Sequence, residues 1–121
     1  MTPLLINAAR AFAMVAFADG RLAPIEAGRF SAIASRDPAF TNFGHAAIAD
    51  AWTQASGEVH AAQSFGTALV TIRTEITQPG DKAVLMRVAQ QAVVADGKLE
   101  QQENLAISAL AEALGLDPTK F

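Results

Sequence analysis

A nine-residue pattern that occurs twice constrains the fold of this chain more than any other feature. The pattern is Ala-Asp-Gly, a basic residue, Leu, three variable residues and Glu; it covers residues 18–26 and, 77 residues later, 95–103. Glycine commonly ends a helix, and an acidic residue is favoured in the first turn of the next one. Each copy therefore predicts a helix, a short loop and a second helix, and the repeat predicts a duplicated helical hairpin.

The rest of the sequence also favours helices. Alanine, which has the highest helix propensity, is the commonest residue, and the alternating pattern of β-strands is almost absent. Hydrophobic residues make up 51% of the chain and charged residues 17%, which excludes a disordered tail. We predict an all-α fold: a compact bundle of about six helices built on the two hairpins, with pseudo-two-fold symmetry, as a single domain over residues 1–121.

Prolines, glycines and capping residues set the boundaries of these helices. The predicted helices cover residues 3–18, 24–35, 42–55, 59–75, 81–95 and 101–114. Gly57 is expected to end the third helix, and Pro79-Gly80 to separate the fourth from the fifth. Gly20 is expected to end the first helix in the left-handed conformation that glycine adopts readily, and Gly97 and Gly115 are expected to end the fifth and sixth helices.

Composition and charge exclude several classes of function. The chain has no cysteine, which rules out disulfides, thiolate metal ligands and a cysteine nucleophile. Its net charge of -3 offers no broad basic surface for nucleic acid. The N-terminus lacks the basic start of a signal peptide, and the longest apolar run, residues 11–18, falls short of the ~20 residues that span a bilayer. We therefore expect a cytoplasmic protein with no nucleic-acid partner and no membrane insertion.

The repeated pattern places acidic residues on both sides of each predicted loop. Asp19 and Asp96 lie at the C-terminal ends of helices, where the helix dipole disfavours negative charge. Glu26 and Glu103 lie in first turns, where the dipole favours an acid and a glutamate can complete a capping box. Two interpretations remain open: these acids are turn and cap residues paired with the nearby basic residues, or they bind a cation.

In the second interpretation, Asp19, Glu26, Asp96 and Glu103 are the ligands. Carboxylates without a nearby thiol or imidazole suit Ca²⁺, Mg²⁺ or Mn²⁺ better than Zn²⁺ or Cu²⁺. The order Asp-Gly-x-Leu-x-x-x-Glu matches the second half of an EF-hand calcium loop. The first half is missing, because the positions two and four residues before each aspartate are apolar: Phe17, Val15, Val94 and Ala92. A true EF-hand is therefore excluded.

The duplicated pattern, in an alanine-rich chain that carries ALAEALGLDP near its end, resembles the TerB family. That family covers tellurite-resistance proteins and the N-terminal region of DjlA-type membrane co-chaperones. The resemblance extends over residues 8–36 and 84–116, while the middle of the chain carries no matching motif. It implies a small all-α cytoplasmic domain with a pseudo-symmetric pair of hairpins.

The resemblance also implies a function. It implies that the acidic cluster, formed by Asp19, Glu26, Asp96 and Glu103, binds a divalent metal. The expected metal is calcium. It further implies a role in the response to tellurite or other chemical stress, with protein partners that include membrane-associated Ter proteins. Glu100 adds an acid to the second copy, which is therefore expected to bind metal first. Because no thiol is available, we expect no direct reduction of tellurite by side chains.

The sequence is also compatible with a second function and argues against a third. A helical protein-interaction scaffold without a metal needs only the hairpins and stays open. A hydrolase with paired carboxylates lacks a nucleophile or phosphate loop, so we expect no enzyme activity. His45 and His60 fall on different predicted helices and are not expected to bind metal together. Phe40 and Phe43 are expected to be partly exposed.

Overall fold

The computed structural model describes residues 3–17, 25–62, 66–96 and 101–117, except for the side chains of 93–96 and 101–103. Within these ranges the chain forms six α-helices, one 3₁₀ helix and no strand, which confirms the all-α prediction. In chain order the elements are α1 (Pro3–Ala16), α2 (Ile25–Arg36), η2 (Pro38–Phe40), α3 (His45–Ala62), α4 (Gly66–Glu75), α5 (Pro79–Asp96) and α6 (Gln101–Ala113). None of the helices in the described ranges has the length and hydropathy needed to cross a membrane.

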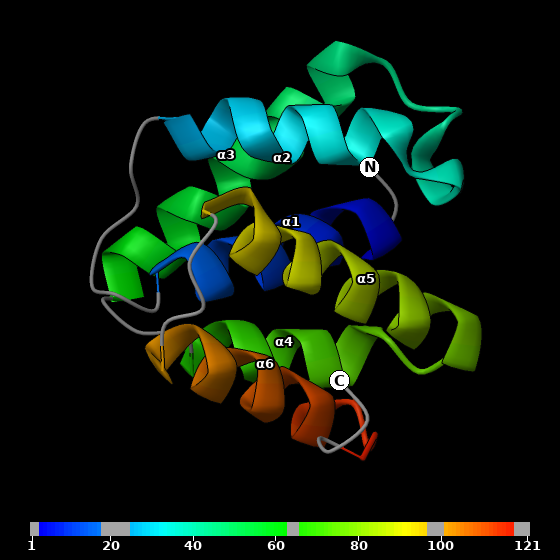
Figure 1. The fold of residues 1–121 in the computed structure, drawn as a ribbon. Helices are drawn as coiled ribbons and strands as arrows, with labels where there is room; N and C mark the ends of the chain where they lie inside the picture. Colours follow the sequence, from blue (N-terminus) through cyan, green and yellow to red (C-terminus); the bar gives the residue numbers. More distant parts are fainter. Residues whose placement is uncertain (1–2, 18–24, 63–65, 97–100, 118–121) are drawn as a thin grey trace.

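The helices form three layers of two (Figure 1). α2 and α3 make one outer layer, α1 and α5 the central layer, and α4 and α6 the other outer layer, and the two helices of each layer are in contact. α1 and α5 run in one direction, and α2 and α6 run in the opposite direction. The hairpins α1–α2 and α5–α6 therefore point the same way, with α2 and α6 on opposite sides of the central layer, as the pseudo-two-fold repeat predicts.

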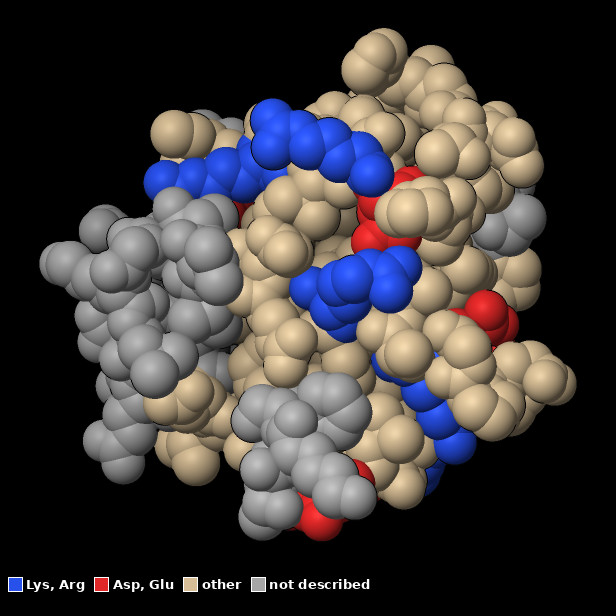
Figure 2. All heavy atoms as spheres, turned by 45° about the vertical axis from the view of Figure 1, so that its right-hand side comes forward, with Lys and Arg blue, Asp and Glu red and all other residues tan. Residues whose placement is uncertain are grey.

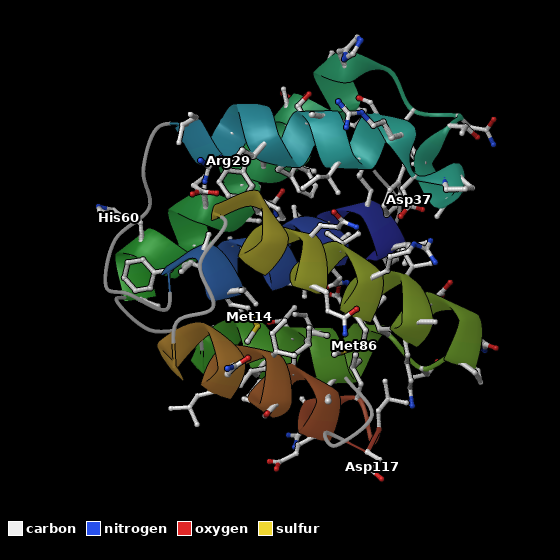
Figure 3. The ribbon with its side chains drawn as sticks, in the orientation of Figure 1. Met14, Arg29, Asp37, His60, Met86 and Asp117 are labelled. Atoms are coloured by element: carbon white, nitrogen blue, oxygen red, sulfur yellow. The ribbon has the colours of Figure 1, made fainter. Side chains whose placement is uncertain are left out.

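α1 is the core of the bundle. Every residue from Leu5 to Val15 is buried, including two polar ones, and the helix contacts all five other α-helices. A helix buried on all sides is typical of the centre of a domain. Met14 of α1 and Met86 of α5 are fully buried on the side that faces α4 and α6 (Figure 3).

Three aromatic rings join α1 to the layer formed by α2 and α3. The ring centroid of Phe12 lies 5.6 Å from that of Phe30 and 5.7 Å from that of Trp52, both edge-on. Phe30 and Trp52 stack at 5.5 Å. Such pairs add about 0.5–1.5 kcal/mol beyond the burial of their area. Phe40, expected to be partly exposed, is instead completely buried, because the 3₁₀ turn of η2 directs it into the core.

The boundary between the third and fourth helices differs from the prediction. α3 continues through Gly57 to Ala62, and α4 begins at Gly66 rather than near Val59. The apolar stripe of α3 passes through this region at helical spacing: Ile48, Ala51, Trp52, Ala55 and Val59 are all buried. The burial of this stripe outweighs the ~1 kcal/mol that glycine costs inside a helix.

The start of α5 and the end of α6 can be compared with the predicted helix boundaries. α5 begins at Pro79, so Pro79-Gly80 forms its first turn, where a proline loses no helical hydrogen bond. Gly115, with φ 73°, follows α6 as predicted. The amide of Leu116 donates to the carbonyl of Ala111 at 2.8 Å, a bond typical of a glycine-ended helix. The corresponding predictions for Gly20 and Gly97 lie outside the described residues.

Candidate functional site

Glu26 is the predicted ligand whose side chain the structure describes. It is the second residue of α2, where the helix dipole favours an acid, and only 7% of its surface is exposed. Its Oε1 lies 3.2 Å from Nη1 of Arg29, one turn further along the helix. Glu26 is thus a shielded carboxylate that already has a cationic neighbour.

The other predicted ligands are located only in part. Asp19 lies outside the described residues. Asp96 is the last residue of α5 and Glu103 the third residue of α6, but their side chains are outside the described part. Both residues therefore occupy helix ends, as expected, while their role as ligands stays a prediction.

The ends of four helices lie on one side of the bundle, on the left in Figure 1. They are the C-terminal ends of α1 and α5 and the N-terminal ends of α2 and α6, and we call this region the hairpin end. The described helix ends that flank the two copies of the repeated pattern therefore lie on the same side of the bundle. Among the described side chains alone, no group of three or more histidine, cysteine, aspartate or glutamate residues could hold a metal ion.

The two histidines lie on one helix, contrary to the prediction. His45 is the first residue of α3 and His60 lies in its last turn, because the helix continues through Gly57. A separation of 15 residues along a helix corresponds to about 22 Å. Both side chains belong to exposed residues, and His60 projects away from the bundle (Figure 3). They do not share a site.

A buried arginine organises a cluster that the sequence did not predict. The Arg10 cluster consists of Asn7, Arg10, Glu58 and Glu75. Nε and Nη2 of Arg10 lie 3.1 Å from Oε1 and Oε2 of Glu58, respectively, and Nη1 lies 3.2 Å from Oε1 of Glu75. Asn7 donates to the same Glu75 oxygen at 2.8 Å and accepts from Arg10 at 2.9 Å. The cluster ties α1 to α3 and α4.

Exposure within the Arg10 cluster is uneven. The Arg10 side chain is 9% exposed, whereas those of Glu58 and Glu75 are each 41% exposed. The sequence does contain a signal: Asn7 and Arg10 stand one turn apart in a stretch that is otherwise apolar. Buried polar groups need partners, so this pair indicates acceptors elsewhere in the chain, though not which ones.

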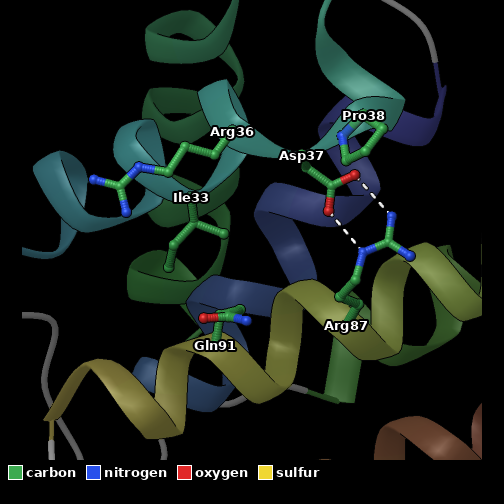
Figure 4. A pocket seen from close by; sticks show the side chains of 6 residues that line it. All are labelled: Ile33, Arg36, Asp37, Pro38, Arg87 and Gln91. Atoms are coloured by element: carbon green, nitrogen blue, oxygen red, sulfur yellow. Dashed lines mark hydrogen bonds and ion pairs between the residues drawn. The ribbon is translucent and has the colours of Figure 1, made fainter.

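A second ion pair connects the end of α2 to α5 (Figure 4). In the Asp37–Arg87 bridge, Nε of Arg87 donates to Oδ2 of Asp37 at 2.8 Å and Nη2 donates to Oδ1 at 2.7 Å. The amide of Ala39 also donates to Oδ1, at 3.0 Å, which caps η2. Asp37 lies at the opposite end of α2 from Arg29 (Figure 3), so this bridge is separate from the hairpin end.

The bridge holds both partners ionised. The hydrogen bonds from Arg87 lower the pKa of Asp37 below its ordinary value, against burial, which raises it. The same contact raises the pKa of Arg87, although burial acts in the opposite direction. The Asp37 side chain is 6% exposed and that of Arg87 is 48% exposed. The sequence did not predict that Asp37 pairs with an arginine 50 residues further along the chain.

These features define a class of small all-helical domains built on a duplicated hairpin with acids at the helix ends. A family model described as "Tellurite resistance protein TerB" matches residues 5–121. The chain belongs to the TerB family, a family of domains associated with tellurite resistance. The match includes the middle helices, where the sequence offered no motif. Comparisons with curated proteins and with solved structures gave no match.

Proposed function

We propose that this TerB-family chain is a divalent-cation-binding domain that acts in the response to tellurite or other chemical stress. The proposed ligands are Asp19, Glu26, Asp96 and Glu103, and the proposed cation is Ca²⁺, with Mg²⁺ or Mn²⁺ as alternatives. The observation that supports this most is the common location, at the hairpin end, of the four helix ends that flank the two copies of the pattern.

Electrostatics supports a cation at this position. Carboxylates gathered in one place repel one another, and a divalent ion offsets that repulsion. Oxygen-only ligand sets suit hard cations, which take six to eight oxygen ligands in the case of Ca²⁺. A single Asp–Glu pair would bind such an ion weakly. The shared location of the two hairpin junctions supports one site that draws on both pairs.

The contact between Arg29 and Glu26 allows the role of Glu26 as a cation ligand to be tested. Its guanidinium lies 3.2 Å from Glu26 and adds positive charge beside one proposed ligand. A cation on Glu26 has to compete with this contact. Replacement of Arg29 by glutamine should therefore strengthen cation binding, whereas Glu26→Gln should weaken it. Unchanged affinity in both variants would remove Glu26 from the site.

The main experiment is thermal unfolding of chelator-stripped protein with and without millimolar Ca²⁺, Mg²⁺, Mn²⁺ or Zn²⁺. A ligand at 100 times its Kd adds about 2.7 kcal/mol to the free energy of unfolding, which raises Tm by several degrees in a domain of this size. We expect a rise that is largest with Ca²⁺. The double variant Asp19→Asn with Asp96→Asn should lose it.

The matched control is Asp50→Asn, which neutralises an exposed aspartate on α3, away from the repeated pattern. This variant should keep the full Ca²⁺-dependent rise in Tm. An absence of any cation-dependent rise in the unmodified protein would contradict the proposal. An equal loss in all variants would point to unspecific charge effects instead.

An interaction scaffold is the second candidate function. Ile25, the first residue of α2, and Leu105, in α6, are each 60% exposed and lie toward the hairpin end. Exposed apolar side chains can serve as contacts for another protein. We propose cytoplasmic protein partners, membrane-associated Ter proteins among them, for either function. Partner binding that is lost in Ile25→Ser but indifferent to Ca²⁺ and chelator would favour the scaffold without a metal.

A further inference from the structure

An open pocket of about 300 Å³ lies beside the Arg10 cluster, and we call it the Arg10 pocket. Its lining residues come from α1, α3 and the end of α4: Pro3, Ile6, Arg10, Gln54 and Glu75. The start of α1 and the end of α4 lie on the side of the bundle opposite the hairpin end (Figure 1). The volume lies at the lower end of the ~300–1,000 Å³ that is usual for small-molecule sites.

The Arg10 cluster carries one net negative charge, because Arg10 has two carboxylate partners. Glu58 balances the charge of Arg10 through contacts to both Nε and Nη2. Glu75, which lines the pocket, contacts Nη1 alone, so its charge is the one that Arg10 does not balance. An anion is therefore disfavoured in the Arg10 pocket, and a ligand with a single positive charge matches it.

Two side chains in the lining have acceptors to offer. Oε1 of Glu75 accepts from Asn7 and Arg10, while Oε2 makes no hydrogen bond to any other described residue. Gln54 is exposed, and its side chain makes no hydrogen bond within the described part of the chain. A primary ammonium group has three N–H donors, which suit a carboxylate oxygen and an amide oxygen. Ca²⁺ takes six to eight oxygen ligands, and these two acceptors fall far short of that number.

The Arg10 cluster also holds Glu75 in place. Arg10 and Asn7 both donate to its Oε1, at 3.2 and 2.8 Å, and Asn7 also donates to the carbonyl of Pro3 at 2.8 Å. The carboxylate is thereby fixed before any ligand arrives, which lowers the entropy cost of binding. Pro3 and Ile6 give the pocket an apolar part that suits methylene groups.

The pocket beside the Asp37–Arg87 bridge has the opposite charge (Figure 4). Arg36, Arg87 and Asp37 are its charged lining residues, which leaves one net positive charge. Lys and Arg also take up more of the surface than Asp and Glu on the face shown in Figure 2, although the chain has a net charge of -3. A ligand that binds through its positive charge should therefore distinguish the two pockets.

We propose that the Arg10 pocket binds a primary ammonium group carried on a short aliphatic chain. Glu75 and the amide oxygen of Gln54 would accept hydrogen bonds from the ammonium group, and Pro3 and Ile6 would contact the aliphatic chain. Two sources supply such a ligand: a free aliphatic amine, or the lysine side chain of a peptide. The site is independent of the proposed metal site, so either can fail without the other.

The test is an NMR titration of isotope-labelled protein with butylammonium chloride, in a buffer that contains a chelator. n-Butanol, which has a similar shape without the charge, and sodium chloride are the matched ligand controls. With butylammonium only, we expect saturable shifts at the amides of residues 4–10, 52–57 and 73–76, and none at residues 33–38 and 87–91 around the positive pocket. Equal shifts with n-butanol or sodium chloride, or none with butylammonium at tens of millimolar, would overturn the proposal.

Variants assign the shifts to the Arg10 pocket. Glu75→Gln keeps an acceptor for Asn7 and Arg10 but removes the charge. It should raise the Kd for butylammonium about five- to tenfold, the effect of one charge-assisted contact. Glu112→Gln, which changes an exposed glutamate on α6 outside the pocket, should leave the Kd unchanged. An unchanged Kd in Glu75→Gln contradicts the assignment.

Position 54 gives a second test that leaves the Arg10 cluster intact. Gln54→Lys adds a competing ammonium group to the lining and should raise the Kd, whereas Gln54→Glu adds a carboxylate and should lower it. A change of the same sign in both variants would show that charge does not govern binding. A capped tripeptide with a central lysine, compared with its Nζ-acetylated form, separates the sources: tighter binding than butylammonium supports a lysine side chain, and weaker binding supports a free amine.

Discussion

The molecule contains two ion-pair clusters in which the buried partner carries opposite charge. In the Arg10 cluster the buried group is the cation, and the two glutamates that surround it are partly exposed. In the Asp37–Arg87 bridge the buried group is the anion, and the arginine is half-exposed. The buried Arg10 has two carboxylate partners, whereas the described residues give the buried Asp37 a single cationic one.

The comparison shows which substitutions should matter most. A buried charge is costly when it loses its counter-ion, while an exposed charge that loses its partner is solvated by water. The exposed partner of a single pair is therefore more important for stability than its surface position indicates. In a cluster with two exposed partners, removal of either one still leaves the buried charge with a counter-ion. Each single removal should therefore have a small effect on stability.

The largest effect is expected at Arg87. Among the described residues, Arg87→Ala leaves the buried Asp37 with the backbone amide of Ala39 as its one remaining hydrogen-bond donor. We expect a loss of about 2–3 kcal/mol in the free energy of unfolding at pH 7, below the range for fully buried pairs because Arg87 is half-exposed. Urea unfolding measures this loss.

Arg87→Lys serves as the matched control for the same position. It keeps the positive charge but replaces the two-pronged contact with a single ammonium group, so the loss should be smaller than that of Arg87→Ala. Arg73→Ala on α4 gives the baseline for an exposed arginine. If Arg87→Ala is no more destabilising than Arg73→Ala, the bridge contributes nothing measurable and the comparison breaks down.

The Arg10 cluster should respond in a non-additive way. Glu58→Gln or Glu75→Gln alone leaves Arg10 one carboxylate, and we expect each to cost about 1 kcal/mol or less. The double variant leaves a cation with a 9% exposed side chain without a counter-ion and should cost about 2–3 kcal/mol, more than the two single losses together. A double-mutant cycle by urea unfolding measures the difference. Strict additivity would show that Arg10 does not couple the two glutamates.

The bridge also predicts a dependence on pH. Since the pKa of Asp37 is lower in the folded chain than its ordinary value of 3.8, the unfolded chain binds the proton more readily. The stability from the bridge is therefore complete above the unfolded pKa and is lost as the pH falls through the folded pKa. Asp37→Asn should be less stable than the unmodified protein at pH 7, by about 1–2 kcal/mol, and should approach it as the pH falls below the folded pKa of Asp37. A difference that stays constant with pH would contradict this.

The sequence could predict the helices because their signals are local. The helices on either side of each copy of the repeated pattern and the position of Gly115 follow from neighbouring residues, and the structure confirms them. At Gly57, however, local sequence signals predicted a helix end that the structure does not have. A glycine favours a break, but the burial of residues on both sides of it depends on contacts with other helices, which no local pattern reveals.

The candidate sites also differ in whether local sequence signals could predict them. The acids at the hairpin end could be proposed as ligands because their types and spacing repeat along the chain. The Arg10 cluster and the Asp37–Arg87 bridge could not, since their partners on different helices are separated by 48 to 68 residues along the chain. Their positions depend on how the layers pack, and only the need of Asn7 and Arg10 for partners was visible in the sequence.

The smallest expected effect connects Gly57 to the Arg10 cluster. Glu58 reaches Arg10 only because α3 continues through the preceding glycine. Gly57 is exposed, and a Cβ added there would meet no atom within 4 Å. Gly57→Ala should therefore raise the free energy of unfolding by about 0.5–1 kcal/mol, because alanine favours the helix and restricts the unfolded chain. Gly115→Ala, at a φ of 73°, should lower it instead, and urea unfolding of both variants would detect the opposite signs. If Gly57→Ala destabilised the protein, the helix would break at Gly57 in solution, and the contact between Glu58 and Arg10 would have to be abandoned with it.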